Sequence, residues 1–272
     1  MMAVLFFILL EKLYFCNVEK ISAVIITLNE EKNIARCLQS LEGIADEIVV
    51  VDSGSTDKTE EICKNFGVNF VKQKWLGYSE QKNFANSLSK FDYILSIDAD
   101  EVISETLKKS ICFEKNNFFS GVYCFNRLTN YCGKKWIRHC GWYPDKKIRI
   151  FNRNNAKWIG NIHETLSFSS NVVVIPLKGD LYHYSFHSIE EHIKQADKFT
   201  TLTAMEAFKN KEKITNFSLL IKPCWKFFRD YFFKGGFLDG YYGYIVCKIS
   251  SFATFLKYTK LKQLQKQNET KS

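Results

Sequence analysis

The sequence contains no closely spaced pair of cysteines. Its nine cysteines are odd in number and scattered along 272 residues, and none of them belongs to a C-x-x-C pair. Disulfide frameworks and structural zinc sites rely on paired cysteines at regular spacings. We therefore expect neither, and a reducing cytoplasm is the simplest compartment for the chain.

The sequence also lacks an apolar run long enough to cross a membrane. The run MMAVLFFILL opens the chain and has ten residues, whereas a spanning helix needs about 18 to 20. No basic residues precede it, and no small-x-small cleavage site follows soon after. We expect residues 1–19 to form an N-terminal apolar segment at the surface or at an interface, or to reflect a misassigned start, rather than a secretion signal.

Tandem repeats and long low-complexity segments are absent too. The content of 46% apolar and 15% aromatic residues excludes a disordered chain and allows one large domain with an appendage. The net charge of +9 is unevenly placed, because residues 209–272 contain thirteen Lys or Arg and four Asp or Glu. The basicity thus belongs to the C-terminal quarter, and the rest of the chain is balanced.

Apolar runs alternate with amphipathic stretches between residues 21 and 98. The predicted strands are ISAVIITLN, ADEIVVVDSGS, VNFVKQ and FDYILSID, and a helical pattern lies between each pair. This alternation indicates a parallel sheet covered by helices. Four strands with three crossovers predict a Rossmann-like half domain.

Beyond residue 110 the pattern changes to shorter strands, and from about residue 189 helices return. The later strands are GVYCFNRL, KKIRIFNR and NVVVIPL, which indicate a more antiparallel second half. We predict an α/β fold with a Rossmann-like mixed sheet and flanking helices over residues 20–190. A helical, aromatic and basic region is expected over residues 191–272, broken at Gly235-Gly236 and Gly240.

Polar clusters follow the first, second and fourth predicted strands. They are TLNEE at 27–31, DSGSTD at 52–57 and DADE at 98–101. The carboxyl ends of parallel strands share one edge of a sheet, where loops and helix N-termini present free N–H groups to ligands. The sequence therefore predicts that these three clusters converge on one rim.

Asp52 ends the second predicted strand. The residues after it have ordinary structural uses, since Ser55 or Thr56 can cap the next helix and Gly54 can adopt a positive φ. None of those uses needs Asp52, and a carboxylate that faces the crevice can accept hydrogen bonds from a nucleoside. Both interpretations remain open from the sequence.

Asp98 and Asp100 are separated by one residue. In an extended segment such residues project to the same side, about 6 to 7 Å apart. Two carboxylates so placed can share a hard divalent cation whose other positions take phosphate oxygens, as Mg²⁺ and Mn²⁺ prefer. The alternative is that both residues cap a helix that starts near Ser104 and favour its positive end.

Three of these stretches, in their order and spacing, resemble the glycosyltransferases of family 2. They are ISAVIITLNEEKNIARCLQSL, EIVVVDSGSTDKT and DYILSIDADE. Further along, WLGYSEQKNFA, NRLTNYCGKKWIRHCGWYPDKKIRIFNR and WIGNIHETL resemble the subgroup associated with lipopolysaccharide core biosynthesis, which extends the resemblance to about residue 190. The resemblance implies a GT-A fold and an enzyme that uses a nucleotide-sugar donor.

The resemblance also implies a set of nucleotide-binding residues. They are Thr27, Asn29, Glu30, Asp52, Lys82 and Asp98. The first three would line the nucleoside site and Asp52 would bind the base. Asp98 and Asp100 match the D-x-D motif of the family and would hold Mg²⁺ or Mn²⁺ against the donor diphosphate. Lys82 would contact the ribose or a phosphate, or else be a solvated lysine of its helix.

An inverting transfer also needs a base that takes the proton from the acceptor hydroxyl. One candidate is Glu164 in WIGNIHETL, where the adjacent His163 would be a third metal ligand or a phosphate contact. The other is Asp145 in HCGWYPDKK, with Arg149 and Arg153 nearby to pair with anionic groups. The remaining histidines are expected to be structural or exposed: His139, His183, His187 and His192.

The C-terminal region is rich in aromatic residues. Residues 217–258 contain fourteen of the 42 aromatic residues, interleaved with lysines and one arginine. Such a helix can lie in the headgroup layer of a membrane, or it can dock its rings on the catalytic domain. Membrane contact suits a glycolipid acceptor, so we expect a peripheral position at the inner face of the cytoplasmic membrane. No nucleic-acid module accompanies the charge, and no nucleic-acid partner is expected.

The sequence thus favours a metal-dependent inverting glycosyltransferase that acts on a glycan or glycolipid in lipopolysaccharide or cell-envelope polysaccharide biosynthesis. Two alternatives remain. A sugar-phosphate nucleotidyltransferase would usually carry a basic, glycine-rich loop after the first strand, where this chain has the acidic TLNEEKN. A non-catalytic lipid-binding or partner-binding protein on a degenerate fold is disfavoured because Asp52, Asp98 and Asp100 are all present.

Overall fold

The computed structural model describes residues 19–160 and 164–269. The chain divides into two compact units. The first contains the described residues of Met1–Phe125 and Lys147–Leu181, and the second those of Asn126–Lys146 and Tyr182–Ser272. The expectation for the N-terminal apolar segment concerns residues that, up to residue 18, lie outside the described part.

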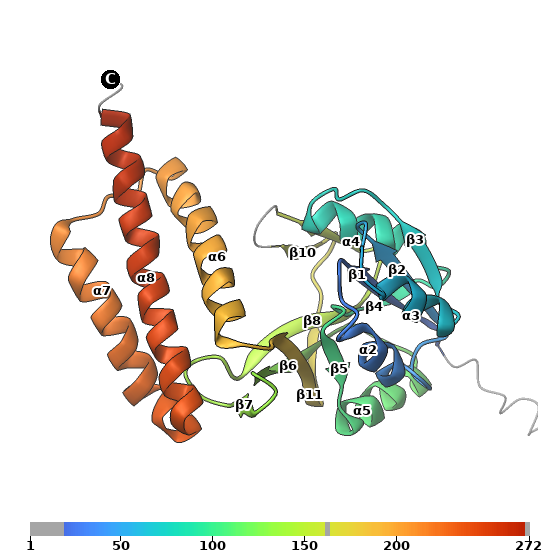
Figure 1. The fold of residues 1–272 in the computed structure, drawn as a ribbon. Coiled ribbons are helices and arrows are strands. Elements are labelled where there is room, and N and C mark those ends of the chain that lie inside the picture. Colours follow the sequence, from blue (N-terminus) through green and yellow to red (C-terminus); the bar gives the residue numbers. More distant parts are fainter. Residues whose placement is uncertain (1–18, 161–163, 270–272) are drawn as a thin grey trace, which may run out of the picture. The chain divides into compact units, whose positions relative to one another are not determined.

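The first unit starts with four parallel strands (Figure 1). They are β1 (Ile21–Thr27), β2 (Glu47–Asp52), β3 (Asn69–Lys72) and β4 (Tyr93–Ser96). They lie in the order β3-β2-β1-β4, and the crossovers are α2 (Ile34–Ser40), α3 (Thr59–Asn65) and α4 (Tyr78–Ser87). The predicted Rossmann-like half is therefore confirmed.

Strands β1, β2 and β4 are buried on both faces. On one face, residues such as Ile25 and Leu95 pack with α2 and α5 (Glu105–Asn116). On the other face, Val24 and its neighbours pack with α4 and with β9 (Ala156–Ile159). Burial on both faces explains why these strands are nearly continuous apolar runs rather than alternating ones.

Further strands extend the sheet beyond β4, and the first of them is antiparallel to it. β8 (Asp145–Asn152) pairs with β4, and β6 (Val122–Tyr131), β11 (Val174–Phe186) and β5 (Glu101–Ile103) follow in that order. β7 (Lys135–Ile137) pairs with β6, and β10 (Thr165–Phe168) forms a separate hairpin with β9. The mixed sheet confirms the predicted α/β fold class.

Three long helices dominate the second unit. They are α6 (Ile189–Lys209), α7 (Asn216–Phe228) and α8 (Gly240–Glu269), and both α6 and α7 pack against α8 (Figure 1). A π-helical turn (Arg229–Phe233) and a 3-10 turn (Gly236–Asp239) join α7 to α8. The helical region is interrupted at the predicted glycines. Gly235 and Gly240 both adopt a φ of 64°, a backbone conformation that favours glycine. Among the described helices, none combines the length and apolarity needed to cross a membrane.

His192 is buried in the aromatic core of the second unit. Its ring packs against those of Tyr131, Trp142 and Phe186, and the Tyr131 hydroxyl lies 2.8 Å from His192 Nδ1. Burial lowers the pKa of His192 from 6.5 to about 4, because the charged imidazolium would lose its hydration. The expected structural role of this histidine fits its surroundings.

We expect this histidine to destabilise the protein in mild acid. Between pH 6.5 and about 4 the unfolded chain binds a proton at His192 that the folded chain does not. Stability therefore falls as the pH falls through this window, by about 3 kcal/mol in total. Denaturant unfolding across pH 4 to 8 should show a flatter pH dependence for His192→Phe than for the wild type. His187→Gln, at an exposed site, should keep the wild-type slope, and equal slopes for wild type and His192→Phe would contradict the prediction.

Candidate active site

The predicted clusters lie at one edge of the parallel strands. Thr27 and Asp52 are paired at the carboxyl ends of β1 and β2, and Asp98 follows β4, which pairs in parallel with β1. Because ligands of open α/β sheets bind at this edge, the rim is the candidate site.

Asp52 organises the loop that follows β2. Its side chain is fully buried, and Oδ2 accepts hydrogen bonds from the backbone N–H groups of Gly54 at 2.9 Å and Ser55 at 2.8 Å. Oδ1 accepts a hydrogen bond from the Ser55 hydroxyl. The buried Asp52 carboxylate thus fixes the conformation of the loop at the rim.

The loop after β1 is tied to the loop after β2. Asn29 adopts a positive φ of 56°, its N–H donates to Ser55 Oγ at 2.8 Å, and its Oδ1 accepts from the Thr56 N–H at 2.8 Å. The Glu30 N–H donates to Thr59 Oγ1 at 2.8 Å. Both loops are therefore held in one conformation before any ligand arrives.

Thr27 carries an unsatisfied hydroxyl at this rim. The residue is 5% exposed, and its Oγ1 has no hydrogen-bond partner among the described residues. Buried hydroxyls are usually paired, so this one is a polar group that a ligand could satisfy.

The D-x-D segment is a turn and not an extended strand. The Glu101 N–H donates to the Asp98 carbonyl at 3.0 Å, so the expected strand-like projection of Asp98 and Asp100 is wrong. The alternative role as helix caps is also wrong, because Ser104 caps α5 and accepts from the Leu107 N–H. Asp98 and Asp100 are thus not needed to start that helix.

Glu101 and Arg149 form a buried ion pair beneath Asp98. Glu101 is fully buried, its Oε2 accepts from the Asp98 N–H at 3.0 Å, and Arg149 is 3% exposed. Arg149 Nη2 donates to Asp98 Oδ2 at 2.7 Å and to Glu101 Oε1. Burial alone would lower the pKa of Arg149, but the two carboxylates raise it. The prediction that Arg149 pairs with an anionic ligand is therefore wrong, since its charge is used inside the protein.

Lys82 is buried at the same site. It is 4% exposed, its Nζ lies 3.0 Å from Glu164 Oε1 and 3.4 Å from Asp98 Oδ1, and it sits 4.6 Å from the centre of the Trp158 ring. The alternative of a solvated helix lysine is wrong. Lys82 instead links α4, Asp98 and Glu164 into one charged cluster.

The second base candidate lies in the other unit. Asp145 starts β8, and its Oδ2 accepts hydrogen bonds from Arg127 Nε at 3.0 Å and pairs with Nη2 at 2.8 Å. Both base candidates are therefore paired with a cation. His163, the predicted third metal ligand, lies outside the described residues.

Sequence reasoning missed Arg149 as an internal partner and Trp158 as a wall of the site. The available signal for Arg149 was its position between two isoleucines in a strand that otherwise belongs to the core. A charged residue in such a place requires a buried counter-ion.

The residues at the rim fit one kind of metal site. Within residues 19–160 and 164–269, no group of three or more His, Cys, Asp or Glu side chains is placed to hold a metal ion. Mg²⁺, by contrast, commonly takes one or two carboxylates and completes its shell with phosphate oxygens and water, and Asp98 supplies a carboxylate just after the carboxyl end of β4, with Asp100 two residues further along.

Comparisons with known proteins identify the family. The sequence model described as Glycosyl transferase family 2 matches residues 22–144. The protein named Uncharacterized glycosyltransferase RT0209 of Rickettsia typhi is 36% identical over 258 residues, which cover 90% of this chain and 88% of that protein. The lipopolysaccharide core biosynthesis glycosyltransferase LpsC of Rhizobium meliloti is 28% identical over 257 residues, with 89% and 92% covered.

Among solved structures, S. aureus TarS 1–349 in complex with UDP is similar, with a TM-score of 0.44, 17% identity, and 89% of this chain and 91% of that chain covered. The Rickettsia relative matches across nearly the whole of both sequences, well beyond the residues of the rim. This chain therefore belongs to the glycosyltransferases of family 2.

Proposed function

We propose that this glycosyltransferase moves a sugar, with inversion, from a nucleotide-sugar donor to a glycan or glycolipid acceptor. The single observation that supports the donor site best is the rim itself. There the unsatisfied Thr27 hydroxyl, the loop fixed by Asp52 and the Asp98 carboxylate share one edge of the sheet. The hydroxyl groups of a nucleoside diphosphate could pair with Thr27. A divalent cation bound to its phosphates could pair with Asp98.

We assign the nucleoside to Thr27, Asn29, Glu30 and the Asp52 loop. The buried Thr27 hydroxyl would gain from a base or ribose the hydrogen bond that it does not make within the described part of the chain. Lys82 is assigned to the diphosphate, because its ammonium already lies 3.4 Å from Asp98 Oδ1. A phosphate close to Asp98 would be within reach of the same ammonium.

Asp98 and Asp100 are proposed to hold Mg²⁺ or Mn²⁺, and His163 remains a proposed third ligand. Such a cation offsets the charge that develops on the diphosphate leaving group. Arg149 and Glu101 position Asp98 for this role. Arg149 holds the Asp98 side chain by a hydrogen bond, and Glu101 holds its backbone N–H. Glu164, 3.0 Å from Lys82, is the proposed base that takes the acceptor proton, and Asp145 is the second candidate.

Titration of UDP and GDP with and without Mn²⁺ tests the proposal. We expect one of them to bind about tenfold to a hundredfold more tightly with Mn²⁺, a gain of ~1.4 to 2.7 kcal/mol. Asp98→Ala and Asp100→Ala should remove this gain. The matched control is Asp92→Ala, an exposed aspartate just before the other end of β4. Binding without a metal effect, or a metal effect that survives both site variants, would overturn the proposed site.

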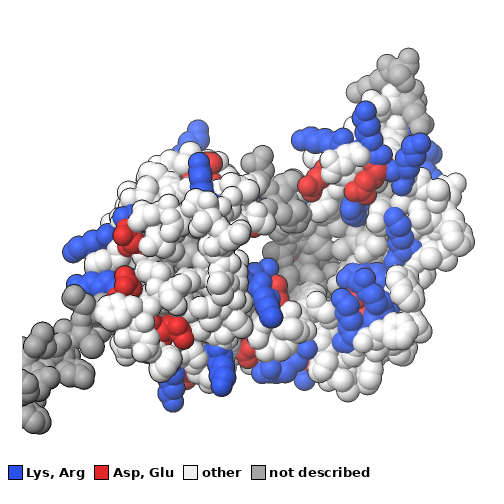
Figure 2. Space-filling view, turned by 180° about the vertical axis from the view of Figure 1, so that it is seen from behind, with Lys and Arg blue, Asp and Glu red and all other residues white. Residues whose placement is uncertain are grey.

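Membrane association is proposed for the region after residue 190. Support comes from the exposed apolar side chains of α7 and the π-helical turn, among them Phe217, Trp225 and Phe233, which are 73%, 53% and 70% exposed. Lysines and Arg229 lie among them, whereas Asp230 and Asp239 are buried. On the face that Figure 2 shows, Lys and Arg atoms cover more surface than Asp and Glu atoms do. Aromatic rings and cations in this combination suit an anionic lipid surface.

Replacing two of these rings tests the membrane proposal. The double variant Trp225→Ser, Phe233→Ser should move the protein from the membrane fraction to the supernatant. Because each buried ring contributes about 1.5 to 3 kcal/mol, we expect at least a tenfold lower partition onto vesicles of phosphatidylglycerol and phosphatidylethanolamine. Phe113→Ser, which removes a 66% exposed ring from α5, should partition like the wild type. Unchanged sedimentation of the double variant would contradict the proposal and leave the donor site untouched.

The acceptor and the pathway are proposed from the relatives. LpsC is named as a lipopolysaccharide core biosynthesis glycosyltransferase, and a membrane glycolipid acceptor agrees with the proposed membrane contact. We therefore place the reaction in lipopolysaccharide or cell-envelope polysaccharide biosynthesis. Membership in family 2 disfavours the nucleotidyltransferase and the non-catalytic alternatives.

A further inference from the structure

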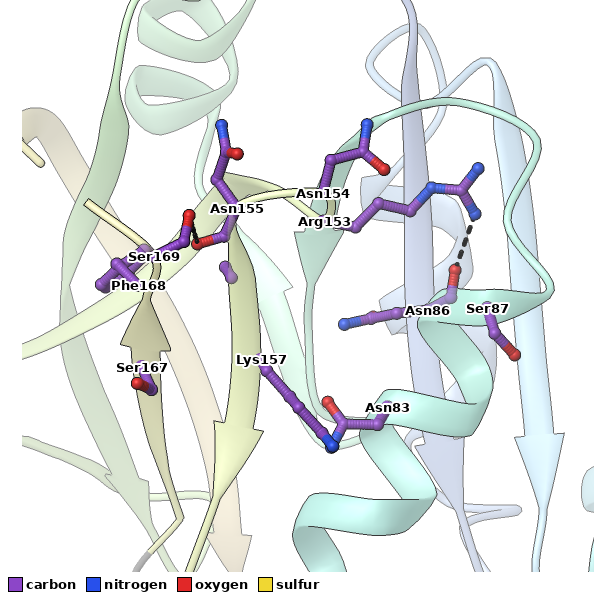
Figure 3. A pocket seen from close by; sticks show the side chains of 11 residues that line it. Asn83, Asn86, Ser87, Arg153, Asn154, Asn155, Lys157, Ser167, Phe168 and Ser169 are labelled. Atoms are coloured by element: carbon purple, nitrogen blue, oxygen red, sulfur yellow. Dashed lines mark hydrogen bonds between the residues drawn. The ribbon is translucent and has the colours of Figure 1, made fainter.

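A cavity lies in the first unit, and it is separate from the rim. It has a volume of about 610 Å³ and is lined by the end of α4, the turn between β8 and β9, and the end of β10. Figure 3 shows Asn83 and Asn86 on one wall and Lys157 on β9 opposite them. None of its lining residues belongs to the proposed donor site.

The topology places this cavity at the opposite edge of the sheet. α4 starts after the carboxyl end of β3 and runs back toward the start of β4, so Asn86 and Ser87 lie near the amino ends of the parallel strands. The Arg153 N–H donates to the Asp92 carbonyl just before β4. Asp52 and Asp98, in contrast, lie at the carboxyl ends. A ligand in the cavity would therefore not occupy the nucleotide site.

Two of the lining residues hold the walls together. Asn83 donates from Nδ2 to the Trp158 carbonyl and accepts at Oδ1 from the Trp158 N–H, both at 2.9 Å, so it fastens β9 to α4. Arg153 Nη1 donates to the Asn86 carbonyl at 3.0 Å (Figure 3). It also donates to the Ser89 carbonyl at 2.6 Å, just after the end of α4. The cavity is thus preformed, as small-molecule sites usually are.

Asn86 is the one lining residue whose buried amide is unsatisfied in the described part of the chain. It is 6% exposed, and its Oδ1 has no hydrogen-bond partner. Figure 3 shows its side chain directed from α4 toward the space that faces β9. Leaving such a group unpaired costs about 1 to 3 kcal/mol. A ligand hydroxyl would satisfy it, because a hydroxyl can both donate to and accept from an amide.

The charge of the cavity is positive. Its lining includes Arg153 and Lys157 and no Asp or Glu. Among the described residues, Asp92 is the acidic partner of Arg153, at 3.6 Å and 56% exposed. The remaining lining side chains are mostly amides and hydroxyls, with Phe168 as an aromatic ring. Amides with one ring suit a sugar, and the exposed ammonium of Lys157 suits a carboxylate or phosphate on it.

We infer that this cavity is a second carbohydrate-binding site, which takes a saccharide that carries a carboxylate or a phosphate. Asn86 pairs with a ring hydroxyl, Phe168 packs against the apolar face of the ring, and Lys157 pairs with the anionic group. The site binds the saccharide and does not convert it. The inference does not depend on the roles proposed for Asp52, Asp98 or Glu164.

Binding of simple sugars to the full chain tests the inference. The probes are glucose, glucuronic acid, glucose 6-phosphate and inorganic phosphate, each titrated and followed by calorimetry and by the NMR signals of the side-chain amides. We expect glucuronic acid or glucose 6-phosphate to bind at least fivefold more tightly than glucose and phosphate alone, and to shift the Asn86 amide signals. Asn86→Leu and Lys157→Gln should each weaken this binding at least fivefold.

Two controls separate this site from the donor site. Lys109→Gln, an exposed lysine on α5, and Asp98→Ala should both bind the acidic sugar like the wild type. Lys157 is exposed, so its substitution tests the site even if Asn86→Leu folds poorly. The inference fails if phosphate alone binds as tightly as the sugar phosphate, if no acidic sugar binds, or if Asp98→Ala removes the binding while Lys157→Gln does not.

Discussion

Glu164→Gln is expected to lower kcat by about 10² to 10⁴ while the KM for the donor changes little. Glutamine keeps the size of the side chain and can still accept the hydrogen bond from Lys82 Nζ, which now spans 3.0 Å. The glutamine side chain cannot take a proton, so only the step in which the acceptor hydroxyl loses its proton should become slower. Release of nucleoside diphosphate, measured with membrane extract as the source of acceptor, gives both constants.

Asp145→Asn is the matched control for this prediction. Asp145 is paired through two nitrogens of Arg127, whereas Glu164 is paired with Lys82, which also lies beside Asp98. We therefore expect Asp145→Asn to change kcat by less than about tenfold. The opposite result, a large loss for Asp145→Asn and a small one for Glu164→Gln, would move the proposed base to Asp145.

Arg149→Met should destabilise the first unit by about 3 to 5 kcal/mol. The substitution leaves Glu101, which is fully buried, without the cation that offsets its charge. Asp98 loses the same partner. Denaturant unfolding should show a lower midpoint with an unchanged slope, because the surface exposed on unfolding stays about the same.

A double variant separates the buried charge from lost packing. Arg149→Met combined with Glu101→Leu removes both members of the pair and should recover part of the lost stability, because no unpaired glutamate remains. Arg36→Met, a substitution on the surface of α2, should change stability by at most about 0.5 kcal/mol. A loss below about 1 kcal/mol for Arg149→Met would show that water reaches Glu101 and that the pair is not a structural support.

The sequence predicted the parallel half of the fold and the rim because both depend on local patterns. Apolar runs and glycine positions mark β1, β2 and β4, and the polar clusters follow directly from where those strands end. Strands β5 and β7 have three residues each, too few to show any period. They form because the neighbouring strands supply partners, which a local pattern cannot reveal.

The details of the site depended on contacts distant in the sequence. Glu101 and Arg149 are 48 residues apart, and Lys82 and Glu164 are 82 apart. Spacing placed Asp98 and Asp100 in an extended segment, but the backbone turns there so that Glu101 can support Asp98 from below. Similarly, the sequence left Lys82 open between a ribose or phosphate contact and a solvated lysine of its helix, and its burial depends on distant residues such as Trp158 and Glu164.

The arrangement of charges around α7 and α8 has a consequence for ionic strength. Asp230 is paired with Lys226, Arg229 and Lys234, and Asp239 is paired with His139, so both acids between residues 216 and 268 are used internally. The outward charge of this segment therefore has one sign. At about 0.15 M salt the reach of such charges is about 8 Å, and at 1 M it is about 3 Å. Residues 216–268 should thus bind polyanions in dilute buffer and release them at high salt concentration. A polyanion that also makes apolar contacts should stay bound.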